Sequence, residues 1–145
     1  MFTDSTVGDL MTKDLFLVEQ NQKLARADEI MRTQRVRHVL VVDEEGELQG
    51  VLSQRDLFHG GLLRALGFGA HAKDQALDSL LVKEAMKTDV ITTGPEASLE
   101  NAARLMTEKK IGCLPVLDAG KLVGILTEGD FVLLAAGKKG VLPAS

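Results

Sequence analysis

The chain has 145 residues and a formal net charge of −4, with 45% hydrophobic and 26% charged residues. This composition is typical of a folded globular protein and excludes a largely disordered chain. The charge argues against general nucleic-acid binding because no long basic stripe offsets it, and the lack of any run of 18 apolar residues predicts no membrane span.

The expected location is the cytoplasm. Cys113 is the only cysteine, so a disulfide within the chain is impossible and a reducing compartment fits best. The N-terminus also lacks the basic and apolar regions of a signal peptide.

Hydrophobic periodicity and turn residues divide the first half of the chain into short elements. In chain order they are an amphipathic turn at 7–11, a strand at 14–19, a helix at 23–35, strands at 38–43 and 48–53, and a helix from Asp56 to about Leu66. The helix at 23–35 has its apolar residues on one side, and the β-branched run at 38–43 favours a strand that is covered on both faces. Gly67 and Gly69 are expected to end the last helix.

The second half predicts the same order of elements. They are a strand at 89–93, a helix from 99 to about 110, strands at 113–118 and 122–127, and a helix at 129–136. Ser98 is the expected N-cap of the first of these helices, and Gly137 the expected end of the last. Residues 70–81 are interpreted as a linker with some helix. Lys138 and Lys139 are interpreted as part of a solvated tail.

The two halves are a tandem repeat. Residues 7–57 align with 82–131 at an offset of 75, which becomes 74 after a one-residue gap. Coinciding pairs include Met11/Met86, Asp14/Asp89, Leu24/Leu99, Gly50/Gly124 and Asp56/Asp130. Because a repeat of about 50 residues is marginal for folding alone, the halves are expected to share a core. The predicted fold is α/β (α+β), with two β-α-β-β-α repeats and paired clefts. The predicted boundaries are repeat 1 at 7–68, a linker at 69–81, repeat 2 at 82–137 and a C-terminal tail at 138–145.

The first candidate for chemistry is a hydroxyl residue followed three positions later by a carboxylate. It occurs as Ser53-x-x-Asp56 and as Thr127-x-x-Asp130. One interpretation is structural, because Ser or Thr caps a helix and Asp stabilises its first turn. The other is functional, because a carboxylate at a helix start can accept two hydrogen bonds from a vicinal diol such as ribose. Duplication copies structure and function alike, so both interpretations stay open.

The second candidate lies where each first helix gives way to the next strand. Arg37 there is either a phosphate contact or an ordinary surface arginine, and His38 is either a ligand contact or a hydrogen-bonded, partly buried histidine. The histidines and the one cysteine show no zinc-site spacing. The chain also lacks the motifs of phosphate loops, dinucleotide sites and nucleophile elbows, so an enzyme is not expected and no cofactor is required.

The chain resembles the tandem cystathionine β-synthase (CBS) domain family, whose paired module is also called a Bateman domain. The resemblance covers residues 7–136 and rests on an ordered set of motifs that occurs twice. As it stands in the second half, the set comprises Val-x-x-x-Met-x-x-Asp, Leu-x-x-Ala-x-x-x-Met, Ile-Gly-Cys-Leu-Pro-Val-Leu-Asp, Gly-x-x-x-Gly-Ile-Leu-Thr and Thr-x-x-Asp. It implies repeats related by a pseudo-two-fold axis, with small sheets packed with helices, often assembled as a homodimer.

The resemblance implies a non-catalytic regulatory module that binds AMP, ADP or ATP in clefts between the repeats and signals by conformational change. S-adenosylmethionine and NAD rank behind these ligands. The residues implied for the first cleft are Ser53, Arg55, Asp56, Val51, Arg37, His38, Met86, Thr88, Ile111 and Gly112. Those implied for the second are Thr127, Asp130, Ile125, Met11, Lys13 and Val36, with Arg37 also a candidate there.

The two repeats depart from the family pattern in different ways. Gly129 stands where Arg55 stands, which removes a cation beside the second cleft. We therefore hypothesise that the Asp56 cleft binds phosphates more tightly. The signal would pass to a separate effector protein. The alternative is a ligand-free dimerisation or interaction module, because the capping role alone would preserve both carboxylates.

Overall fold

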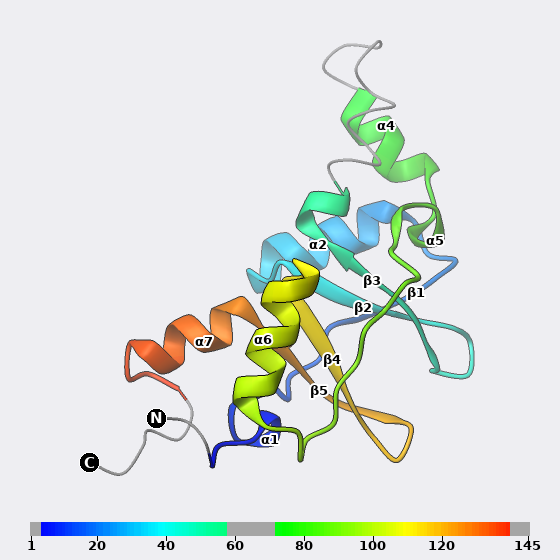
Figure 1. Ribbon diagram of the computed structural model, residues 1–145. Helices are drawn as coiled ribbons and strands as arrows, with labels where there is room; N and C mark the ends of the chain where they lie inside the picture. Colours follow the sequence, from blue (N-terminus) through cyan, green and yellow to red (C-terminus); the bar gives the residue numbers. More distant parts are fainter. Residues whose placement is uncertain (1–3, 58–71, 140–145) are drawn as a thin grey trace. The chain divides into compact units, whose positions relative to one another are not determined.

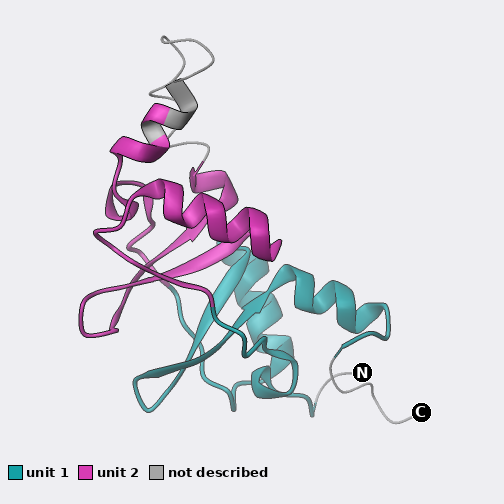
Figure 2. Ribbon diagram, turned by 180° about the vertical axis from the view of Figure 1, so that it is seen from behind, with its two compact units in different colours: residues 1–15, 91–145 teal, residues 16–90 magenta. Residues whose placement is uncertain are grey.

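The computed structural model describes residues 4–57 and 72–139. The chain forms two compact units, coloured separately in Figure 2: unit 1 comprises Met1–Leu15 and Ile91–Ser145, and unit 2 comprises Phe16–Val90. The units do not follow the sequence repeats, because each incorporates the short first helix of the other repeat. α1 (Val7–Leu10) belongs to unit 1, and α5 (Val82–Ala85) belongs to unit 2.

Unit 2 is built on a three-stranded sheet in the order β1-β2-β3 (Figure 1). Its elements are β1 (Leu17–Glu19), α2 (Leu24–Gln34), β2 (His38–Val42), β3 (Leu48–Ser53), α4 (Ala72–Ser79) and α5. β1 and β2 are parallel because a helix connects them, and β2 and β3 are antiparallel across a short turn. The helix predicted from Asp56 is present over 54–57, and the rest of that prediction lies outside the described residues.

Helix α2 buries the side that its sequence pattern predicts. Leu24, Ala27, Ile30 and Met31 recur at helical spacing and are all buried. They form one hydrophobic cluster with residues of β2 and β3 and with Val82 of α5. α4 falls within the predicted linker and packs against α2.

Unit 1 is built on the antiparallel pair β4-β5. Its elements are α1, α6 (Leu99–Lys109), β4 (Cys113–Asp118), β5 (Lys121–Thr127) and α7 (Glu128–Ala135). Ser98 caps α6 by accepting a hydrogen bond from Asn101 N at 2.9 Å, as predicted. Val7 and Leu10 of α1 lie in the core of this unit beside Leu126. The repeats therefore share their cores by exchanging short helices.

The strand predicted at 89–93 is wrong. Within this segment only Thr93 forms a bridge to β4, and its N–H donates to Pro115 O at 3.0 Å. In the first repeat the equivalent ladder has a further bond, from Leu40 N to Phe16 O at 3.0 Å. Pro115 stands at the position of Leu40 and has no N–H, so this bond has no counterpart. The first strand of the second repeat is thereby reduced to a single bridge.

Candidate functional site

Both repeat carboxylates lie where a strand ends and a helix begins. In unit 2, Ser53 N donates to Asp56 Oδ2 at 2.9 Å, and Asp56 N donates to Ser53 Oγ at 3.0 Å. In unit 1, Thr127 N donates to Asp130 Oδ2 at 2.8 Å. These bonds satisfy N–H groups near the start of each helix, which confirms the structural interpretation of both motifs. In each carboxylate this role uses Oδ2 and leaves Oδ1 for other partners.

In unit 2 the segment that follows α5 lies across strand β3. Val51 N donates to Lys87 O at 3.0 Å, and Lys87 N donates to Val51 O at 2.9 Å. Gly50 permits this approach, because a Cβ at its position would lie 2.7 Å from both Lys87 O and Met86 Sδ. The structure thus places Met86 against Gly50 and Lys87 against Val51 on the strand that leads to Asp56.

Unit 1 repeats this arrangement with the segment that follows α1. Thr12 N donates to Ile125 O at 2.8 Å, and Ile125 N donates to Thr12 O at 2.9 Å. A Cβ on Gly124 would lie 2.6 Å from Met11 Sδ and 3.1 Å from Thr12 O. Met11 therefore lies against Gly124 and Thr12 against Ile125 on the strand that leads to Asp130.

At Asp56 the second carboxylate oxygen faces a solvated lysine. Lys87 Nζ lies 3.6 Å from Asp56 Oδ1. The Lys87 side chain is 70% exposed, whereas that of Asp56 is 12% exposed. An ion pair with one such exposed partner contributes little to stability, because water screens the charges. Asp56 Oδ1 can therefore exchange Lys87 for another donor at low cost.

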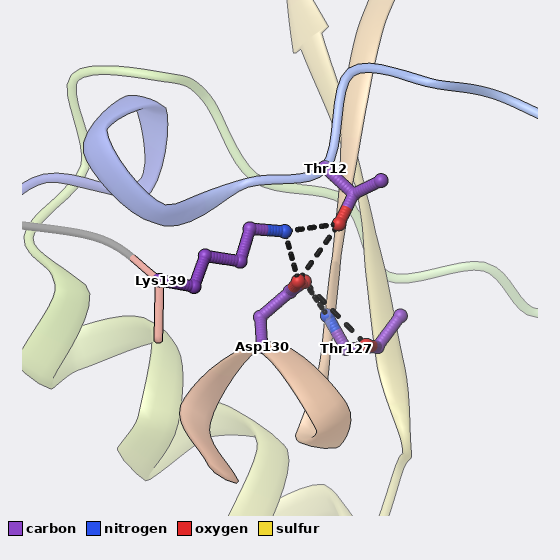
Figure 3. A network of polar contacts seen from close by, with 4 residues as sticks. All are labelled: Thr12, Thr127, Asp130 and Lys139. Atoms are coloured by element: carbon purple, nitrogen blue, oxygen red, sulfur yellow. Dashed lines mark hydrogen bonds and ion pairs between the residues drawn. The ribbon is translucent and has the colours of Figure 1, made fainter. Parts of the chain in front are cut away.

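At Asp130 the second carboxylate oxygen is held more closely (Figure 3). Asp130 is 3% exposed and is the one buried charged residue in the part of the chain that the structure describes. Its Oδ1 accepts hydrogen bonds from Thr12 Oγ1 at 2.7 Å and from Lys139 Nζ at 2.5 Å. Thr127 Oγ1 lies 3.4 Å from Oδ2. The interpretation of Lys139 as a solvated residue is therefore wrong, whereas Lys138 is exposed as expected.

The basic residues predicted for the first cleft lie beside the start of the Asp56 helix. Arg37 O accepts a hydrogen bond from Gln54 N at 2.8 Å. His38 pairs with Ser53 across β2 and β3 and is half-buried. The side chains of Arg37 and Arg55 are exposed. The other predicted residues in this unit are Thr88, which is exposed, and Val36, which is half-buried against the core.

The corresponding backbone contact in unit 1 comes from Gly112, whose O accepts from Glu128 N at 3.1 Å. Ile111 is half-buried against the unit 1 core, and Lys13 is exposed. The resemblance assigns Ile111 and Gly112 to the first cleft, whereas both residues belong to unit 1. It assigns Val36 to the second cleft, whereas this residue belongs to unit 2. These cross-repeat assignments stay predictions.

Three residues that contact the carboxylates were not among the predicted site residues. They are Thr12, Lys87 and Lys139. Thr12 and Lys87 occupy equivalent positions directly after Met11 and Met86, so the repeat alignment contained a signal for both. Lys139 has no such signal, because its contact depends on how the chain turns after α7.

The described ranges, 4–57 and 72–139, contain no group of three His, Cys, Asp or Glu residues that could bind a metal ion. In the same ranges, every helix is too short or too polar to cross a lipid bilayer.

Comparison with known proteins identifies the family. The CBS domain pattern matches this chain twice, over residues 7–61 and 82–137. The chain belongs to the CBS domain family. The resemblance seen in the repeated motifs is thus confirmed, as is the α+β fold with two repeats. CBS domain pairs are regulatory modules.

Similar proteins cover nearly all of the chain. CBS domain-containing protein YhcV of Bacillus subtilis is 35% identical over 129 residues, which is 89% of this chain and 84% of YhcV. The crystal structure of CBSX2 in complex with AMP has a TM-score of 0.72 and 33% identity, covering 92% of this chain and 97% of CBSX2. The CBS domain pair of MJ0100, in complex with 5′-methylthioadenosine and S-adenosyl-L-methionine, has a TM-score of 0.74 and 26% identity, covering 93% and 98%. The chain spans only 64%, 42% and 34% of three further relatives.

Proposed function

We propose that this chain is a non-catalytic regulatory module that binds AMP, ADP or ATP at Asp56 and Asp130 and signals by conformational change. The observation that carries the proposal is the carboxylate at the same strand–helix junction of both repeats, with one oxygen held by a backbone N–H. An ionised carboxylate has the acceptors needed for both hydroxyls of a ribose. AMP, 5′-methylthioadenosine and S-adenosylmethionine, the ligands of the similar structures, all carry such a diol.

The Asp56 site has the chemistry for each part of a nucleotide. Asp56 Oδ1 accepts from the ribose once the exposed Lys87 moves away. Val51 and Met86, which are both half-buried, are the apolar residues proposed for the adenine ring. The exposed guanidinium groups of Arg37 and Arg55 supply positive charge for the phosphates.

Asp56 is proposed as the tighter site for phosphate-bearing ligands. Gly129 replaces Arg55 beside Asp130, so the second site lacks one cation. Asp130 is also more deeply buried than Asp56 and is held by closer contacts. Both differences favour the first site.

Calorimetric titration with AMP, ADP and ATP tests the proposal. Asp56→Asn should raise the Kd of the tighter site about ten- to a hundredfold, the scale of a hydrogen bond to a charged group. Asp89→Asn is the matched control, because Asp89 is an exposed carboxylate outside both junctions, and it should leave binding unchanged. Unaltered binding in the double variant of Asp56 and Asp130 would contradict the site, and a larger loss from Asp130→Asn would contradict the proposed order.

A second candidate function is a ligand-free dimerisation or interaction module. It is favoured by the contacts that both carboxylates already make within the chain, as helix caps and with lysines. Native mass spectrometry together with a thermal shift panel distinguishes the two functions. A dimer without a bound small molecule, whose Tm no adenosine compound raises, supports the second candidate.

The proposed module acts in the cytoplasm as a homodimer and passes its signal to a separate effector protein. A ligand can drive such a signal only if it binds two arrangements of the module with different affinity. Small-angle scattering with and without AMP measures whether the ligand changes the shape of the module in solution. Identical profiles at saturating AMP would argue against conformational signalling.

A further inference from the structure

Lys139 reaches Asp130 because the chain reverses at the end of α7. Gly137 has a φ of +72°, which is a left-handed conformation that favours glycine. Gly137 N donates to Leu134 O at 3.0 Å, and Lys138 N donates to Leu133 O at 2.9 Å. This pair of bonds is the Schellman motif, which turns the backbone out of the helix. The next residue, Lys139, is thereby placed to reach back to the first turn of the same helix.

The contacts of Asp130 leave no acceptor for a ligand. An ionised carboxylate offers about four lone-pair positions. On Oδ2 these face Thr127 N and Thr127 Oγ1, and on Oδ1 they face Thr12 Oγ1 and Lys139 Nζ (Figure 3). A ribose diol can therefore bind Asp130 only by displacing a donor. Lys139 is the donor that can leave, because its long side chain comes from beyond the end of the helix.

Asp56 differs in this respect. Ser53 N contacts its Oδ2, and Lys87 Nζ lies 3.6 Å from its Oδ1 on a side chain that is 70% exposed. By contrast, the Lys139 side chain is only 27% exposed and also contacts the Thr12 hydroxyl at 2.5 Å. The chain therefore supplies its own cation to both carboxylates but retains it firmly at only one.

We propose that Lys139 is an internal competitor for the nucleotide at Asp130 and makes that site selective for ligands that carry a phosphate. The inference rests on the proposed function. An uncharged adenosine that displaces Lys139 leaves the buried Asp130 carboxylate without its cation, which is unfavourable. A 5′-phosphate gives the displaced ammonium a new anionic partner. Lys139 thus determines specificity, because it opposes adenosine more strongly than AMP.

The test uses the full chain with Asp56→Asn, so that Asp130 is the remaining carboxylate site. Lys139→Met keeps the apolar stem and removes the charge, and Lys138→Met is the matched control on the neighbouring exposed lysine. Calorimetry should show that Lys139→Met lowers the Kd for adenosine about tenfold, the scale of one charged hydrogen bond, and that for AMP less than about threefold. Equal Kd values for adenosine in the two lysine variants would overturn the proposal.

A spectroscopic measurement keeps the proposal testable without a lysine variant. In the Asp56→Asn protein labelled with ¹³C-lysine, saturating AMP should shift the Lys139 Cε signal and leave that of Lys138 in place. An unmoved Lys139 signal at saturation refutes displacement. If wild-type protein binds AMP but Asp56→Asn/Lys139→Met binds neither ligand, the Lys139 inference fails alone. If wild-type protein also binds neither ligand, the proposed function fails with it.

Discussion

Gly50→Ala tests whether the exchanged helix segment is an essential part of unit 2. Gly50 lies in the middle of β3, where a Cβ would stand 2.7 Å from both Lys87 O and Met86 Sδ. Real Cβ atoms do not approach other atoms so closely, so either the segment after α5 or the strand must move. Because Lys87 O is a backbone atom, no side-chain rotation relieves that contact.

The cost follows from either response. If the contact is kept, overpacking costs about 1–3 kcal/mol. If the segment moves away, the two hydrogen bonds between Val51 and Lys87 are lost. At about 0.5–1.5 kcal/mol each, their loss costs as much as the overpacking would. Replacing glycine by alanine also restricts the unfolded chain, which offsets part of the loss by about 0.4–1 kcal/mol.

The matched control is Gly129→Ala, which restricts the unfolded chain in the same way without the collision. A Cβ on Gly129 meets only Thr127 Oγ1, at an ordinary 3.5 Å. Urea unfolding followed by far-UV circular dichroism is the assay, because the chain contains no Trp or Tyr. The unfolding free energy of Gly50→Ala should lie about 1–3 kcal/mol below that of Gly129→Ala. Equal stabilities would refute the role assigned to this glycine.

Three further predictions concern caps and the missing strand. Ser98→Ala should lower the unfolding free energy by about 1 kcal/mol, because it removes the acceptor of Asn101 N at the start of α6, and a urea midpoint equal to wild type would contradict this. Gly137→Ala should lower the unfolding free energy by about 1–2 kcal/mol, because alanine is strained at the left-handed φ of this position. A crystal structure of the variant should show Lys139 withdrawn from Asp130, and an intact ion pair would show that the turn is not needed. Pro115→Leu restores an N–H facing Ile91, so hydrogen exchange should reveal a protected amide at position 115, and fast exchange there would disprove the explanation of the lost strand.

Local sequence patterns predicted most of the elements of this fold. The period of apolar residues located α2 and its buried face, and a β-branched run located β2. Ser98 and Gly137 marked a helix start and a helix end for reasons that act within a few residues. The predicted strand at 89–93 failed because its hydrogen bonds depend on a distant residue, Pro115, rather than on its own propensity.

The sequence likewise predicted one part of the candidate site and missed another. The repeat placed Asp56 and Asp130 at equivalent helix starts, because a cap is a local interaction that duplication copies. Their different occupants are not local. Lys87 follows an exchanged helix, and Lys139 follows a chain reversal after α7. A pattern of residue types does not tell how far apart such segments lie in the folded chain.

The amino-acid sequence by itself determined the repeat, the order of helices and strands, the two capped carboxylates and the family. Only the tertiary structure decided which short helix packs into which unit and which cation each carboxylate holds. The physical reason is the distance along the chain over which each interaction acts. Propensity, capping and turn conformation act over about one helical turn, whereas the Asp130–Thr12 hydrogen bond joins residues 118 positions apart and exists only when the chain is folded.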